Sequence, residues 1–150
     1  MTDQPIRAFI DTNIWISAFI NPDGPPAAVL AAFETEAFVA VISQPFLNEL
    51  AAVLARGRIR RRLQVADEKA ADTLTRLNRT AIMTYPTGTL QLCRDPKDDV
   101  MLETAILGHA DYVVSCDDDI KGDLILIAQL QERDIGVVTV AQLLALLDDG

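Results

Sequence analysis

A short apolar run that leads directly into a carboxylate limits what this chain can fold into more than any other stretch. Residues 8–10 are apolar throughout, as in a strand that is covered on both faces, and Asp11 follows at once. Residues 14–19 are typical of a helix, which Thr12 or Asn13 could cap. Asp11 is therefore either a cap of that helix or a side chain at the carboxyl edge of a parallel sheet, where α/β proteins bind ligands.

The alternation of short apolar runs and helical segments continues along the chain. Further strand candidates are residues 38–42, 81–85, 111–115 and 135–138, and segments typical of helices lie between them. This pattern is typical of a parallel sheet with helices on both faces. With 150 residues, the chain is long enough for one core and too short for two ordinary domains, so we expect a single domain over residues 1–150.

Local signals mark where several of the helices begin and end. Ser43 is a good N-cap, and Asp95 is another, followed by proline at the first helical position. Gly108 is placed to end the helix that Asp95 opens. Thr139 and Gln142 are spaced as a capping box for the last helix.

The cysteines and the histidine exclude several kinds of site. Cys93 and Cys116 form no Cys-x-x-Cys pair, so we expect reduced thiols used in packing. His109, the only histidine, follows a glycine at a helix end, where a cap or turn role is sufficient. A zinc site of the usual kind therefore lacks ligands. Residues 1–7 are polar, and no apolar run approaches the roughly 18 residues that span a bilayer, which predicts a cytoplasmic protein without a membrane segment.

Four carboxylates follow strand candidates or open helices beside them: Asp11, Glu49, Asp99 and Asp117. They would converge at one end of the sheet, where like charges raise one another's pKa unless a cation offsets them. Oxygen ligands without histidine favour Mg²⁺ or Mn²⁺, and such an ion suits attack of water on a phosphodiester. The alternative is a set of unrelated helix caps, because 22 acidic residues will place several at loop ends by chance.

Four segments, taken in order, resemble motifs of the PIN-domain ribonucleases over nearly the whole chain. Residues 9–13 are similar to the family's opening signature, and residues 43–54 to the helix that carries its second acid. Residues 94–105 are similar to the segment of its third acid, and residues 110–119 to its last motif. The resemblance is closest to a branch labelled as toxin components of toxin–antitoxin systems.

This resemblance implies a three-layer α/β/α sandwich with a central parallel sheet of four to five strands. It also implies an endoribonuclease whose acidic cluster, Asp11, Glu49, Asp99 and Asp117, holds Mg²⁺ or Mn²⁺ and activates a water for hydrolysis of RNA. Many PIN domains act as homodimers, and a toxin would be held inactive by an antitoxin segment near its active site. The predicted partners are therefore RNA, an antitoxin protein and a second copy of the chain.

The third acid can be either of two neighbours, Asp98 and Asp99. We choose Asp99, because it lies 18 residues before Asp117, a spacing similar to the family's, and because Glu103 is then one helical turn away. Glu103 could be an outer metal ligand or a charge on the helix surface. Asp119 could approach the metal through water.

The residues beside these acids complete the predicted site. Asn13 and Ser115 are expected to be polar supports near Asp11 and Asp117. Ser115 and Cys116 stand where the family frequently has Thr-Gly, which puts a thiol next to the metal and raises the prospect of sensitivity to oxidation.

A cluster of arginines is the one basic patch on an acidic chain. The net charge is −9, which by itself argues against a nucleic-acid partner. Five positive charges nevertheless fall within seven residues, at Arg56, Arg58, Arg60, Arg61 and Arg62. If the chain is a nuclease, RNA phosphates would dock here. The alternatives are a solvated helix end and a surface for an acidic partner chain.

Two other function classes fit part of the pattern. A phosphoryl-receiving signalling domain also places clustered acids, Mg²⁺ and a lysine, here Lys121, on a parallel sheet. It would have an adjacent acidic pair after the first strand, whereas Asp11 stands alone. A non-catalytic α/β binding module would keep the fold without the metal, and the complete set of four acids argues against it.

Overall fold

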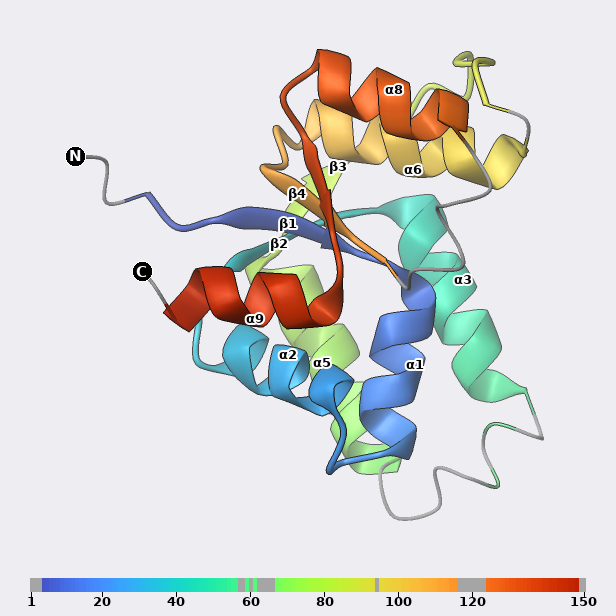
Figure 1. Cartoon of the computed structure of the whole chain (residues 1–150). Coiled ribbons are helices and arrows are strands. Elements are labelled where there is room, and N and C mark those ends of the chain that lie inside the picture. Colours follow the sequence, from blue (N-terminus) through green and yellow to red (C-terminus); the bar gives the residue numbers. More distant parts are fainter. Residues whose placement is uncertain are drawn as a thin grey trace.

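The strands that the structure describes form one parallel sheet (Figure 1). The computed structural model describes residues 4–56, 59, 61, 67–93, 95–115 and 124–148. The strands are β1 (Arg7–Ile10), β2 (Val39–Ser43), β3 (Ile82–Thr84), β4 (Tyr112–Val114) and β5 (Gly136–Val138). Their order in the sheet is β3-β2-β1-β4-β5. The predicted α/β fold with a parallel sheet is confirmed.

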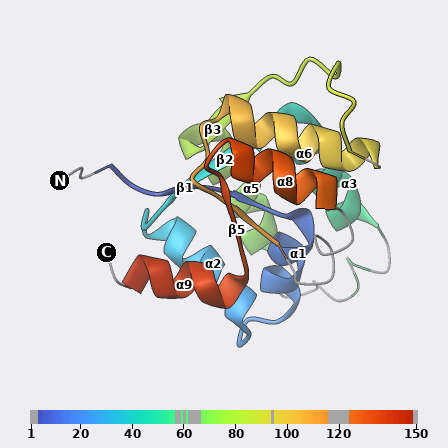
Figure 2. The same ribbon diagram turned by 45° about the horizontal axis from the view of Figure 1, so that its top comes forward.

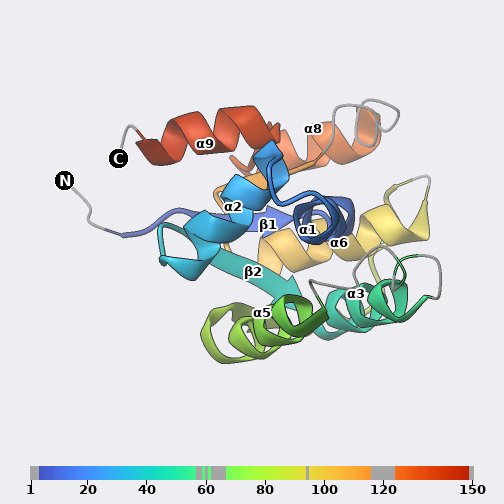
Figure 3. The same ribbon diagram turned by 90° about the horizontal axis from the view of Figure 1, so that it is seen from below.

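Helices lie on both faces of this sheet, which confirms the three-layer α/β/α arrangement. The helices of the described residues are α1 (Thr12–Ile20), α2 (Pro25–Glu34), α3 (Gln44–Ala55), α5 (Asp67–Thr80), α6 (Pro96–Leu107), α8 (Leu124–Glu132) and α9 (Val140–Asp148). α6 and α8 lie side by side over one face (Figure 2), and α2 and α9 pack against each other on the opposite face (Figure 3). None of these described helices has the length and apolar character needed to cross a membrane.

β1 lies at the centre of the sheet, where the order of the strands reverses. It pairs with β2 on one side and with β4 on the other, so that Ala8 lies opposite both Ala40 and Tyr112. The N–H of Asp11 donates to the carbonyl oxygen of Val114 at 3.0 Å, which carries the pairing one residue past β1. In sheets of this order, ligands bind outside the carboxyl ends of the central strands.

The start of α1 is fixed against β1 by packing and by one buried hydrogen bond. Residues 8–10 are buried, as their apolar character predicts, and Trp15 on α1 is 1% exposed. Its indole Nε1–H donates to the carbonyl oxygen of Ile10 at 3.2 Å, and its ring meets Phe33 edge to face at 5.4 Å. A buried indole needs such a hydrogen-bond partner. These contacts hold the turn that carries Asp11.

Side chains cap helices where the sequence predicts. Ser43 Oγ accepts a backbone N–H of the first turn of α3 at 3.4 Å. Asp95 Oδ1 accepts a backbone N–H of the first turn of α6 at 3.0 Å. The N–H of Thr139 donates to Gln142 Oε1 at 2.9 Å, and the N–H of Gln142 donates to Thr139 Oγ1 at 3.2 Å, which closes the predicted capping box.

Gly108 ends α6 as predicted, but the reason is a close approach rather than a left-handed backbone. Its φ is −85°, and the next residue, His109, has the positive φ of 52°. A Cβ atom at Gly108 would clash with Cγ1 of Val41 on β2. The glycine therefore lets the end of α6 approach β2, and His109 makes the turn.

Candidate active site

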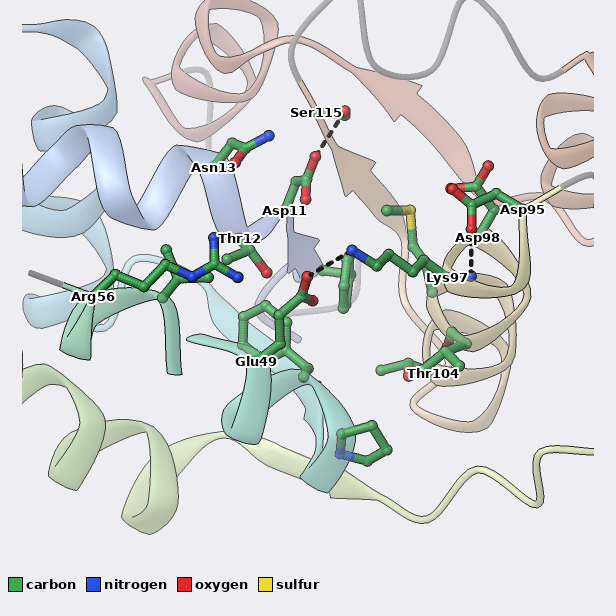
Figure 4. Close-up of a pocket in the computed structure, with 16 residues that line it drawn as sticks. Asp11, Thr12, Asn13, Glu49, Arg56, Asp95, Lys97, Asp98, Thr104 and Ser115 are labelled. Atoms are coloured by element: carbon green, nitrogen blue, oxygen red, sulfur yellow. Dashed lines mark hydrogen bonds and ion pairs between the residues drawn. The ribbon is translucent and has the colours of Figure 1, made fainter. Parts of the chain in front are cut away.

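A cavity of about 650 Å³ opens where β1, β2 and β4 reach their carboxyl ends (Figure 4). Its polar wall comes mainly from three places: the start of α1, the helix α3 that follows β2, and the start of α6. Carboxylates, cations, hydroxyl groups and an amide all contribute to this wall. The polar lining side chains are Asp11, Thr12, Asn13, Glu49, Arg56, Asp95, Lys97, Asp98, Thr104 and Ser115.

Asp11 is half-buried and lies centrally in this wall (Figure 4). Ser115, buried after β4, donates its hydroxyl to Asp11 Oδ2 at 3.3 Å. Asp11 occupies the N-cap position of α1, but within the described residues its carboxylate does not cap that helix. Of the two alternatives for Asp11, the geometry favours a site over a cap. Asn13 is exposed and lines the same cavity.

Glu49 reaches the cavity from the second turn of α3, with 45% of its side chain exposed. Its Oε1 lies 3.8 Å from Nζ of Lys97 on α6. The two helices are also tied together by hydroxyl groups, because Thr104 Oγ1 on α6 lies 3.0 Å from Ser43 Oγ and both residues are fully buried. This buried contact sets how far apart the helices carrying Glu49 and Lys97 lie.

The structure places Asp98, rather than the predicted Asp99, at the cavity. Asp99 is 8% exposed and lines a second hollow of about 350 Å³. Its Oδ1 accepts the N–H groups of Leu92 at 2.9 Å and Cys93 at 2.7 Å. Successive residues of a helix point about 100° apart, so the two adjacent acids meet different surroundings. We therefore take Asp98, in place of the predicted Asp99, as the candidate third acid of this cavity.

Glu103 binds the loop before α6 instead of the cavity. Its Oε2 accepts the N–H of Thr87 at 2.7 Å and the hydroxyl of the same residue at 2.8 Å. Its Oε1 accepts the N–H of Gly88 at 3.2 Å. The predicted role as an outer metal ligand is not supported, because both oxygens hold the loop and the side chain lines the second hollow with Asp99.

Burial and hydrogen bonding shift the pKa values of Asp99 and Glu103 in opposite directions. Burial raises the pKa of Asp99, but donation from the Cys93 and Leu92 N–H groups and from the Cys93 thiol outweighs it, so this pKa lies below its ordinary value. Burial likewise raises the pKa of Glu103, and its donors on Thr87 and the next residue bring this pKa below its ordinary value. Both carboxyl groups are therefore charged anchors of the loop at neutral pH.

The donor chemistry of the cavity fits a hard divalent cation. Asp11, Glu49 and Asp98 offer carboxylate oxygens, and neighbouring hydroxyl and amide groups add neutral ones. Within the described residues, no three acidic, histidine or cysteine side chains converge closely enough to hold an ion. The predicted fourth acid, Asp117, lies outside those residues. In the described part of the wall, the oxygens are of the kind that binds a hard cation, but they do not converge on one position.

Several predicted residues fall outside the part of the chain that the structure describes. They are Arg58, Arg60, Arg62, Cys116, Asp117, Asp119 and Lys121. Of the other arginines in the cluster, Arg56 lines the cavity from the end of α3, and Arg61 is exposed. The structure thus brings one end of the arginine cluster to the acids.

Lys97 and Thr104 line the cavity although sequence reasoning did not select them. Lys97 stands in a run of charged residues typical of a solvated helix start, and Thr104 is one polar residue of a mixed helix. Their spacing is the signal that could have found them. Lys97, Met101 and Thr104 recur at i, i+4 and i+7, which is one face of a helix, and all three line the cavity.

Comparisons with known proteins match a stretch of the chain that includes the candidate acids. A family model described as PIN domain matches residues 7–119, which include Asp11, Glu49, Asp98 and Asp117. A protein of Methanocaldococcus jannaschii, described as "Uncharacterized protein MJ1680", is 28% identical over 115 residues, which are 77% of this chain and 73% of that protein.

Proposed function

This chain belongs to the PIN domain family, which implies nuclease activity, and on that premise we propose that it is a metal-dependent endoribonuclease. One observation carries the proposal: Asp11 after β1, Glu49 on α3 and Asp98 on α6 line the same cavity at the carboxyl edge of the sheet. A capping side chain serves only its own helix, so capping does not require three acids from separate elements to share one cavity. The proposed substrate is RNA, and the bond that is hydrolysed is its phosphodiester.

We assign Asp11, Glu49 and Asp98 to hold Mg²⁺ or Mn²⁺, with Asp117 as the expected fourth ligand. When bound, such an ion supplies the Lewis acidity that lowers the pKa of water and offsets negative charge on the phosphate. A carboxylate of the cavity accepts the proton of the attacking water as the water oxygen bonds to phosphorus. One bridging P–O bond breaks in this displacement, and the leaving oxygen takes up a proton.

Other residues of the wall support the carboxylates and the substrate. The hydroxyl of Ser115 donates to Asp11 and so fixes the direction of one of its oxygens. Arg56 and Lys97 add positive charge to the wall, which suits contact with RNA phosphates. Arg56 is also the first member of the arginine cluster, which supports docking of the RNA backbone beside the cavity.

Membership of the PIN domain family decides against a phosphoryl-receiving signalling domain. A non-catalytic α/β binding module with the same fold is the competing outcome of the test below. Such a module would keep the sheet and its covering helices, but its acids would hold no metal ion that supports RNA cleavage.

Cleavage of a mixed RNA substrate in Mg²⁺ or Mn²⁺ tests the proposed function. We expect Asp11→Asn, Glu49→Gln and Asp98→Asn each to lose at least about 100-fold in kcat/KM, because each removes a negative oxygen from the metal site. Asp99→Asn is the matched control one residue away. It should keep most of the cleavage rate and unfold at a lower temperature, because Asp99 binds the loop N–H groups of Leu92 and Cys93.

The two adjacent acids separate the outcomes. If Asp99→Asn abolishes cleavage and Asp98→Asn does not, the sequence-based choice of Asp99 is right and the assignment of Asp98 is wrong. If the folded wild-type protein cleaves no RNA in either metal, the chain is a binding module rather than an enzyme.

We further propose, on the resemblance of its motifs to toxin components, that the chain is the toxin of a toxin–antitoxin pair and acts in the cytoplasm as a homodimer bound by an antitoxin. Growth arrest on expression, relieved by Asp11→Asn, would support the toxin role. Light scattering of the purified protein measures the oligomeric state. A wild-type chain without effect on growth would instead favour a role in RNA processing.

A further inference from the structure

Lys97 brings a positive charge among the carboxylates of the cavity. Its Nζ lies 3.8 Å from Glu49 Oε1, and its side chain extends from the first turn of α6 toward α3 (Figure 4). Asp11, Asp95 and Asp98 line the same cavity. The ammonium group is therefore paired with one carboxylate of a cavity that three other carboxylates also line.

The stability of α6 does not account for a lysine at this position. The first turn of a helix favours negative side chains and disfavours positive ones, because the macrodipole is positive there. The Lys97 side chain is 80% exposed, so it covers little apolar surface. A residue that breaks a local rule of its own helix is expected at functional sites, and Lys97 breaks the rule for the first turn.

We infer that Lys97 is a displaceable counter-ion: it pairs with Glu49 while no divalent ion is bound, and it turns to an RNA phosphate once an ion takes Glu49. This inference rests on the proposed function as a metal-dependent nuclease. It assigns to one side chain two opposite effects, competition with the metal and assistance to the substrate.

The ion pair is weak enough to be displaced. Its separation of 3.8 Å is long compared with a charge-assisted hydrogen bond, which lies near roughly 2.8 Å. The Lys97 and Glu49 side chains are 80% and 45% exposed, and exposed pairs contribute little to stability. The flexible stem of lysine also lets the ammonium group move. A divalent ion brings twice the charge to the same carboxylate and gains further oxygen ligands, so it would win the competition.

A phosphate over the acids would give the released ammonium group a new partner. Arg56, at the end of α3, lines the cavity on the other side of Glu49 from Lys97 (Figure 4). A phosphate bound above Glu49 would therefore lie between the two cations. Its oxygens would replace the carboxylate as the partner of Lys97.

Lys97→Met tests the inference, because it removes the charge and keeps most of the stem. Thermal unfolding over a Mn²⁺ titration, without RNA, should give a midpoint concentration roughly two- to fivefold lower than that of the wild type, since an exposed ion pair no longer competes. On single-stranded RNA, the dependence of log kcat/KM on log salt concentration should become shallower by about 0.7, the value of one lost phosphate contact. Lys97→Arg should keep the wild-type salt dependence.

Lys69→Met is the matched control. Lys69 on α5 pairs with Glu34 on α2 at 3.6 Å, and its side chain is 58% exposed, so the variant loses an equal charge and a similar pair away from the cavity. It should keep the wild-type Mn²⁺ midpoint and salt dependence. If Lys97→Met behaves like Lys69→Met, or binds Mn²⁺ more weakly than the wild type, the inference is overturned while the nuclease function stands. If the wild type neither responds to Mn²⁺ nor cleaves RNA, the proposed function fails and the inference fails with it.

Discussion

The acids at the start of α6 have different roles although they are neighbours. Asp95 caps the helix, Asp98 lines the cavity, and Asp99 and Glu103 hold the loop that precedes the helix. The helix rotates each successive side chain by about 100°, so acids within one or two turns meet different surroundings. Residue type and spacing therefore do not by themselves assign a carboxylate its role.

Glu103→Gln should destabilise the protein in a pH-dependent way. The pKa of Glu103 is lower in the folded protein than in the unfolded chain. Its charged form therefore stabilises the fold above pH about 4.3, the ordinary pKa of glutamate. This stabilisation is lost as the pH falls through the lower pKa of the folded state. We expect the free energy of unfolding of the variant to be about 1–2 kcal/mol lower than that of the wild type at neutral pH. The difference should shrink as the pH falls below about 4. Urea unfolding over this pH range measures both effects.

Glu132→Gln is the control for this prediction, because it removes one negative charge from an exposed position of α8. Amide hydrogen exchange gives a local reading: the N–H groups of Thr87 and Gly88 should exchange faster in Glu103→Gln and not in the control. Equal loss of stability in both variants would mean that net charge, rather than the loop contact, sets the effect.

At the scale of elements, the site depends on how helices are held to the sheet and to one another. The indole of Trp15 holds α1 to β1, and the contact between Ser43 and Thr104 holds α3 to α6. Gly108 adds a third constraint, because it lets the far end of α6 approach β2. Asp11, Glu49 and the residues at the start of α6 therefore lie on elements whose relative positions are set by buried contacts.

Gly108→Ala should destabilise the protein although alanine is a better helix former than glycine. The new Cβ would clash with the buried Val41 of β2, and overpacking of a filled core costs about 1–3 kcal/mol. Thermal and urea unfolding measure the loss. Since α6 would have to move, metal binding at its other end should weaken in parallel.

His109→Gly is the matched change at the next residue. Its φ of 52° suits glycine, so the variant should be neutral or more stable by less than about 1 kcal/mol. If Gly108→Ala is tolerated and His109→Gly is strongly destabilising, the close approach of α6 to β2 is not what the glycine provides.

At the scale of the whole molecule, an acidic chain should respond to ions in two separable ways. The net charge of −9 opposes compaction, so NaCl should raise Tm modestly by screening. Mn²⁺ at matched ionic strength should raise Tm further, because an ion that binds the folded state adds about 2.7 kcal/mol at 100 times its Kd. Asp11→Asn should keep the response to NaCl and lose the additional response to Mn²⁺. If Mn²⁺ adds nothing beyond matched NaCl in the wild type, screening alone explains the response.

Much of the architecture is predictable from the sequence because it depends on residues close together in the chain. An apolar run such as residues 8–10 must be buried on both faces, and a cap such as Ser43 or Asp95 binds an N–H two or three residues away. The carboxyl ends of parallel strands share one edge, so the meeting of Asp11 and Glu49 at one cavity also follows from the pattern.

The sequence by itself therefore determined the parallel sheet, the main helix boundaries and two of the acids at the cavity. Only the tertiary structure decided that Asp98 rather than Asp99 lines the cavity, that Glu103 holds a loop, and that Lys97 reaches Glu49. The physical reason is that these outcomes depend on the rotation of α6 relative to segments far away in the chain. That rotation is set by packing against β2 and α3 and by N–H groups of the preceding loop, none of which a local pattern contains.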